Sequence, residues 1–152
     1  MTTKEKLMAD MKQAMKDREA GKLRLEVIRM IRSDIRNAEI NNKGKEELTE
    51  SEVLAVIMKG VKLREDSLAE FTKGGRQDLI DQTKEEIAIL KSYLPAALSD
   101  EELTEIIRKA IAETGAQGPK GIGLIMKTVL PQVQGRADGS RISKLAKTLL
   151  SQ

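Results

Sequence analysis

The sequence is most informative in what it lacks. Its 152 residues contain no cysteine, no histidine and no tryptophan, and only one tyrosine and one phenylalanine. Without cysteine there is no disulfide, no thiolate zinc site and no cysteine nucleophile. Without histidine the chain lacks the commonest general base and the commonest transition-metal ligand. We therefore expect no bound metal, no cofactor and no catalysis by the chain alone.

A long apolar run is also missing. The first six residues, Met-Thr-Thr-Lys-Glu-Lys, do not resemble the apolar core of a signal peptide. No later stretch approaches the length of a membrane span. The sequence thus predicts a soluble, cytoplasmic protein with no membrane partner. Its net charge of +3 permits contact with nucleic acid but does not require it.

The composition favours helices. A core without aromatic residues must be filled by Leu, Ile, Val, Met and Ala, which suits helix-on-helix packing. Apolar residues recur at helical spacing, and Thr2, Thr49 and Ser99 each precede a glutamate by three residues, as in a capping box. We predict an all-α fold with an N-terminal four-helix domain over residues 1–94, a linker over 95–98 beginning at Pro95, and a C-terminal three-helix module over 99–152. A turn is expected over residues 41–45.

Glycine and positive charge are concentrated after residue 115. From there onward six basic residues stand against one acidic residue. Glycine costs roughly 1 kcal/mol in a helix interior relative to alanine, so its density here indicates tight turns or close backbone approach. The basic side chains form either a solvated surface or an RNA footprint. The candidate RNA contacts are Lys120, Lys127, Arg136, Arg141, Lys144 and Lys147, of which the last three are expected opposite the apolar stripe of the final helix.

Two glycine-bearing segments and a second basic ridge complete the candidates. Gly135 and Gly139 flank Arg-Ala-Asp, which predicts a turn with Asp138 as helix cap and, alternatively, Arg136 as a phosphate contact. Gly123 with Met126 predicts a close helix–helix crossing. In the helix expected over residues 22–40, a row of arginines is either a solvated flank or a phosphate-facing ridge. This row consists of Arg29, Arg32 and Arg36.

Short motifs follow one another in the order and spacing of a known family. They are Leu25 to Met30, Glu65 to Phe71, Gly75-Arg76-Gln77-Asp78-Leu79, Tyr93-Leu94-Pro95, Gly123-Leu-Ile-Met126, Leu130-Pro131 and Gly135-Arg-Ala-Asp-Gly139. On these motifs the chain resembles, essentially end to end, the YqeY family. The fold of that family is shared with the C-terminal tail of the B subunit of the tRNA-dependent glutamyl/aspartyl amidotransferase.

This resemblance implies a two-part helical fold, and a role with tRNA, because the related tail helps to hold tRNA. The chain differs from the family pattern at Gly121, where an acidic residue is common, and at Leu124, where a lysine is common. No RNA contact is therefore assigned to these two positions.

Three functions remain open. The first is a non-catalytic module that binds tRNA or another structured RNA through the basic residues. The second is an adaptor that docks on an amidotransferase or an aminoacyl-tRNA synthetase through the surface of Gly123 and Met126. The third is an accessory part in glutamine-dependent amide transfer, a carbon–nitrogen ligase reaction, active only within a complex. Amide transfer needs an activated nucleophile with a positioned base, and no serine here has such a partner. We expect the first.

Overall fold

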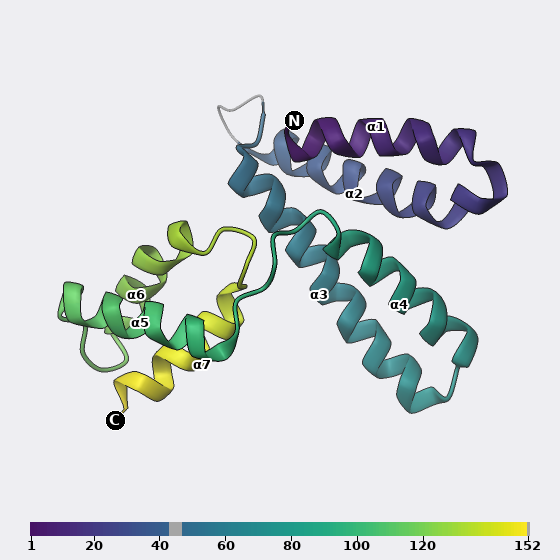
Figure 1. The fold of residues 1–152 in the computed structure, drawn as a ribbon. Helices are drawn as coiled ribbons and strands as arrows, with labels where there is room; N and C mark the ends of the chain where they lie inside the picture. The colour runs from purple at the N-terminus through teal and green to yellow at the C-terminus, as the bar shows by residue number, and fades with distance from the viewer. Residues whose placement is uncertain (43–46, 152) are drawn as a thin grey trace. The chain divides into compact units, whose positions relative to one another are not determined.

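The structure is a computed structural model that describes residues 1–42 and 47–151. These residues form seven α-helices and two short 3-10 helices, and they contain no strand (Figure 1). The predicted all-α fold is confirmed. Residues 43–45 of the expected turn lie outside the described residues. None of the described helices combines the length and apolar character that crossing a bilayer requires.

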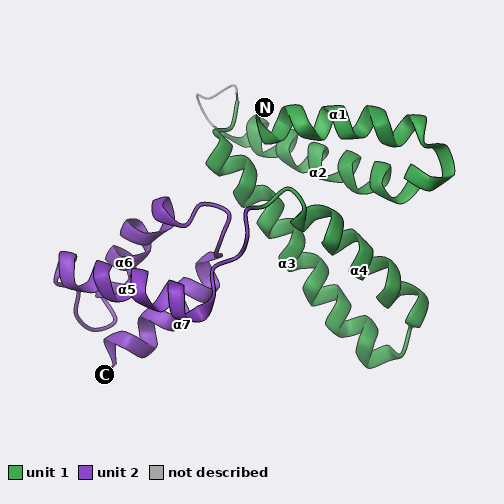
Figure 2. Ribbon diagram, viewed as in Figure 1, with its two compact units in different colours: residues 1–94 green, residues 95–152 purple. Residues whose placement is uncertain are grey.

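The chain divides into two compact units (Figure 2), Met1–Leu94 and Pro95–Gln152, each with its own apolar core. Residues 95–98, for which a linker was expected, are bonded within unit 2. Leu98 is buried there, and its backbone N–H donates to the carbonyl of Arg136 at 3.0 Å.

Unit 1 contains α1 (Thr3–Lys16), α2 (Lys22–Asn41), α3 (Glu50–Gly74) and α4 (Gln77–Lys91). Side-chain caps define two of the helix starts, because Thr2 and Thr49 each accept a hydrogen bond from the backbone N–H three residues later. Helix α3 ends at Gly75, whose φ of +69° is the left-handed conformation that glycine adopts without strain. The largest fully buried side chains of unit 1 are Leu7, Val27, Ile28, Ile31, Val53, Ile57 and Leu90.

Two polar contacts join distant parts of unit 1. The buried carboxylate of Glu39, on α2, accepts from Lys4 Nζ at 2.8 Å and from the Leu48 backbone at 3.3 Å. The hydrogen bond from Lys4 lowers the pKa of Glu39 below its ordinary value. Tyr93 donates its phenolic hydrogen to Asp10 of α1, and burial raises the pKa of this phenol. These bonds hold the start and the middle of α1 against the rest of the unit.

Unit 2 contains α5 (Asp100–Thr114), α6 (Gly121–Val129), a 3-10 turn (Leu130–Gln132) and α7 (Gly139–Leu150). Pro119 lies in the turn that precedes α6, two residues before the helix begins. The core side chains come from all three helices and the turns between them. They are Leu98, Leu103, Ile107, Ala110, Ala116, Ile125, Val129, Val133, Ala137, Ile142 and Ala146.

Candidate nucleic-acid interface

The start of α7 is fixed by its cap. The Asp138 carboxylate accepts a hydrogen bond from the backbone N–H of Arg141 at 2.8 Å, which is the cap that the sequence predicts. Gly135 has a φ of +73°, so the turn before the helix uses a conformation that favours glycine. The cap and the turn together set the direction in which the α7 side chains project.

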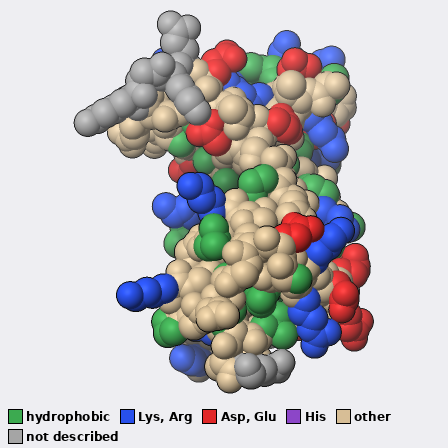
Figure 3. All heavy atoms as spheres, turned by 90° about the vertical axis from the view of Figure 1, so that its left-hand side faces the viewer, with side chains coloured by type: hydrophobic (Ala, Val, Ile, Leu, Met, Phe, Trp, Pro, Cys, Tyr) green, Lys and Arg blue, Asp and Glu red, His purple; other side chains and the backbone are tan. Residues whose placement is uncertain are grey.

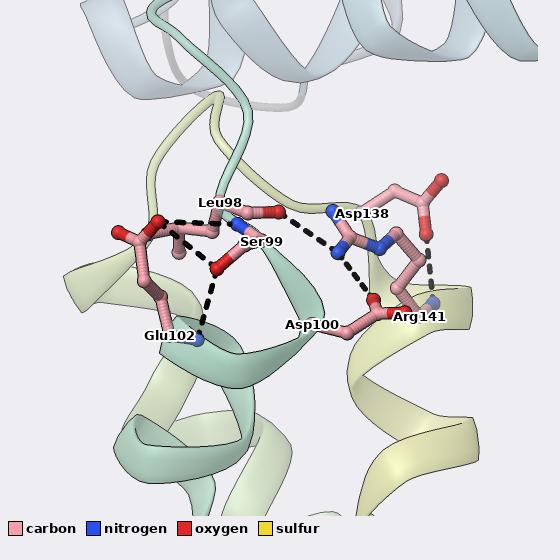
Figure 4. A network of polar contacts seen from close by, with 6 residues as sticks. All are labelled: Leu98, Ser99, Asp100, Glu102, Asp138 and Arg141. Atoms are coloured by element: carbon pink, nitrogen blue, oxygen red, sulfur yellow. Dashed lines mark hydrogen bonds and ion pairs between the residues drawn. The ribbon is translucent and has the colours of Figure 1, made fainter.

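Arg141 does not project into solvent opposite the apolar stripe, as the sequence suggested. Its guanidinium donates to the carbonyl of Leu98 at 2.9 Å and to Asp100 Oδ1 at 2.7 Å (Figure 4). The neighbouring residue, Ser99, caps α5 in a reciprocal capping box with Glu102. Arg141 therefore ties α7 to the N-terminus of α5, and its assignment as an RNA contact stays a prediction.

Arg136 has a similar position. Its Nε donates to the carbonyl of Ala96 at 3.0 Å, and a terminal nitrogen lies 4.0 Å from the Glu102 carboxylate. A phosphate at this guanidinium would stand beside the acidic first turn of α5, which holds three carboxylates in a row. The negative charge of that turn disfavours an anion there. The prediction that Arg136 contacts phosphate is therefore weakened by its surroundings.

The four candidate lysines differ from the two arginines. Each is exposed, and none forms an ion pair or a side-chain hydrogen bond with the described part of the chain. Lysines 144 and 147 lie three residues apart on α7, and on a helix such residues are surface neighbours. Their ammonium groups are free to meet an anion. The four are Lys120, Lys127, Lys144 and Lys147.

Charge is unevenly distributed within unit 2. Residues 95–114 carry two basic and five acidic side chains, whereas from residue 115 onward there are six basic and one acidic. Figure 3 shows one face of the molecule, with basic side chains in blue and acidic ones in red. Arg136 and Arg141 contact residues of the acidic segment, whereas the four candidate lysines are exposed.

An open groove lies beside Lys147. It has a volume of about 440 Å³, and the residues that line it come from the turn before α6, from α6 itself and from the end of α7. Sequence reasoning missed this groove, because it forms where two helices come together. Its lining residues are Gly118, Pro119, Ile122, Lys147, Thr148, Leu150 and Ser151.

Gly123 does not mark a close helix crossing within the chain. It is exposed, and no heavy atom lies within 4 Å of the position that a Cβ would take. The tight glycine of α6 is Gly121, where a Cβ would lie 3.0 Å from the Ala116 side chain. Met126 is half-buried and packs on the core, with its methyl group 3.3 Å from the Cβ position of Gly139. The predicted Gly123–Met126 surface is therefore not a single surface.

The arginine row of α2 has mixed surroundings. Arg29 and Arg36 are exposed, whereas a guanidinium nitrogen of Arg32 lies 3.0 Å from the Met11 sulfur. Arg32 and Arg36 line an open pocket of about 630 Å³ whose walls also carry four glutamates. This balance of charge favours the solvated flank over the phosphate-facing ridge. In the described residues no group of His, Cys, Asp and Glu side chains is arranged to hold a metal ion.

Comparison with known proteins decides the family. A model of the YqeY family, described as "Yqey-like protein", matches residues 4–150. The chain belongs to the YqeY family. The resemblance inferred from the short motifs is thereby confirmed.

Curated relatives share the name "Altered inheritance of mitochondria protein 41, mitochondrial". The protein of Pyrenophora tritici-repentis is 30% identical over 143 residues, which cover 91% of this chain and 76% of that protein. The protein of Kluyveromyces lactis is 37% identical over 67% of this chain and 55% of its own length. The protein of Lachancea thermotolerans is 33% identical over 86% of this chain and 68% of its own length.

These names correct one expectation. The sequence suggested a cytoplasmic protein, but the curated relatives are named as mitochondrial, which contradicts that expectation. Composition could not reveal this, because the absence of an apolar signal segment says nothing about the compartment in which relatives work.

Proposed function

We propose that this chain is a non-catalytic accessory protein that binds structured RNA, with tRNA as the first RNA to test. The proposal rests on two exposed lysines of α7, Lys144 and Lys147, which form no ion pair with the described part of the chain. They lie in a segment with a large basic excess. Lysine ammonium groups act as point charges for phosphate, and neutralised phosphates supply most of the sequence-independent affinity of such proteins.

The mode of binding follows from the composition of unit 2. The only tyrosine and the only phenylalanine of the chain lie in unit 1, so unit 2 has no aromatic ring on which a base could stack. Contact is therefore with the RNA backbone and its shape. The groove beside Lys147 contributes through that lysine, which is the charged residue of its lining.

The family supports this proposal indirectly, through the resemblance of its fold to the tRNA-holding tail of the amidotransferase B subunit. An accessory part in glutamine-dependent amide transfer within a complex is compatible with the same surface. It is the weaker proposal, because the bond from the Ser99 hydroxyl to the Glu102 carboxylate belongs to the capping box of α5 and is explained by that structural role.

The test is binding of purified tRNA to the full chain over a series of salt concentrations. In the double variant Lys144→Gln/Lys147→Gln we expect weaker binding and a salt slope smaller by roughly 2, about 1 per lost phosphate contact. The matched control is Lys120→Gln/Lys127→Gln, which removes the same charge from α6 and the residue that precedes it.

Equal losses in the two double variants would show a general effect of charge and contradict the α7 surface. Absence of wild-type binding at low salt would overturn the proposal as a whole.

A further inference from the structure

Gly123 has no role in the packing of the chain. It is the third residue of the nine-residue helix α6, it is exposed, and the space around its missing Cβ is open. Its φ is not positive, so the backbone does not require glycine either. Alanine is the better helix former at such a position. The fold itself therefore gives no reason for a glycine here.

The residues around Gly123 form a second stripe on α6. Helix α6 buries Gly121, Ile125 and Val129 on one side. The outer side carries Leu124 and, just beyond the helix, Leu130, whose side chains are 45% and 43% exposed. Spacings of three, four and seven residues place the members on one face of a helix. We call this the α6 outer face, and it consists of Lys120, Gly123, Leu124, Lys127 and Leu130.

We propose that the α6 outer face is a docking surface for an acidic amphipathic helix of a partner protein. Gly123 lets another helix backbone come close. The two exposed leucines supply apolar area for burial. Lys120 and Lys127 lie roughly 10 Å apart along the axis and are unpaired within the described residues, so they match carboxylates two turns apart on the partner.

Other occupants fit this surface less well. An RNA backbone would gain nothing from two exposed leucines, since phosphates bury no apolar surface. A second copy of the chain, docked face to face, would bring lysines against lysines and repel. Complementary charge therefore selects a partner of opposite sign with an apolar stripe of its own.

This surface is distinct from the proposed RNA contact. Ile122 lines the groove together with Lys147. On a helix with 3.6 residues per turn, Lys127 points roughly 140° away from Ile122. The inference thus goes beyond the proposed function and does not depend on it.

A defined probe can test the docking surface. The probe is a synthetic 18-residue helical peptide with two glutamates seven residues apart and leucine and alanine between them on one face. We expect saturable binding at low salt to the full, isotope-labelled chain, with NMR shift changes concentrated at residues 120–131. Lys120→Gln/Lys127→Gln should weaken binding at least tenfold, whereas Lys144→Gln/Lys147→Gln should leave it unchanged.

Substitutions at Gly123 separate docking from folding. Gly123→Leu should weaken peptide binding at least fivefold without lowering the melting temperature, because its side chain enters open space. Gly123→Ala should raise the melting temperature.

Several results would overturn the proposal. One is the absence of saturable binding, and another is equal binding of a peptide with lysines in place of the glutamates. NMR shift changes concentrated on α7 would also contradict it, as would displacement of the peptide by tRNA acting at the same residues.

Discussion

The two units differ in which charged side chains join their helices. Unit 1 places polar bonds between helices that are far apart in the sequence, with Lys4 bound to Glu39 across 35 positions and Asp10 to Tyr93 across 83. The buried polar side chains among the described residues, Glu39 and Thr83, both belong to unit 1. Unit 2 encloses a core of apolar side chains and leaves its lysines outside.

This difference shows where charge is available for binding. Where a carboxylate or ammonium group joins two helices, releasing it to a ligand costs stability. In unit 2 the arginines do this work at the junction of α5 and α7, because a guanidinium can donate to a carbonyl and a carboxylate at once. The lysines have no such task, so a ligand can use them at little cost to the fold.

The largest expected effect tests whether the two cores are independent. Ile28 in unit 1 and Ile107 in unit 2 are fully buried. Replacing either by alanine should cost about 2–5 kcal/mol. We expect calorimetry to show that Ile28→Ala lowers the transition of unit 1 and Ile107→Ala that of unit 2. If both variants lower one shared transition, the units are not separate in stability.

A smaller effect is expected at the buried pair of unit 1. Glu39→Gln removes a charged acceptor from Lys4 and should cost about 1–3 kcal/mol. Because the folded pKa of Glu39 lies below its ordinary value of 4.5, its contribution is complete above that pH and is lost as the pH falls through the folded pKa.

Urea unfolding at pH 7 and at successively lower pH measures both effects. Wild type and Glu39→Gln should converge as the pH falls. A constant difference at every pH would show that the pair does not act through its charge.

The smallest effect concerns arginine and lysine on α7. Arg141→Gln should destabilise unit 2 by about 1 kcal/mol, a modest value because a third of the side chain is exposed. Lys144→Gln should change stability by less than about 0.5 kcal/mol. Thermal unfolding of the two variants measures the difference in their stability. Equal stability would show that Arg141 contributes no more to the fold than Lys144 does.

Local features of the fold were predictable from the sequence, because each depends on residues only a few positions apart. The caps at Thr49 and Ser99 and the left-handed end at Gly75 are examples. The role of Arg141 was not predictable. Helical periodicity places it on a polar face, but its partner Leu98 lies 43 positions away. Nor does the sequence distinguish Gly121, which needs to be small, from Gly123, which does not.

The position of Tyr93 has a practical consequence for spectroscopy. It is the only tyrosine, and the chain has no tryptophan, so ultraviolet absorbance and intrinsic fluorescence above the range of phenylalanine come from one ring in unit 1. Unit 2 is optically silent there. Signals from that ring therefore report whether α1 is packed against the end of α4, where Tyr93 donates its hydrogen bond to Asp10. Events in unit 2, including its unfolding, need a label or a backbone probe to be seen.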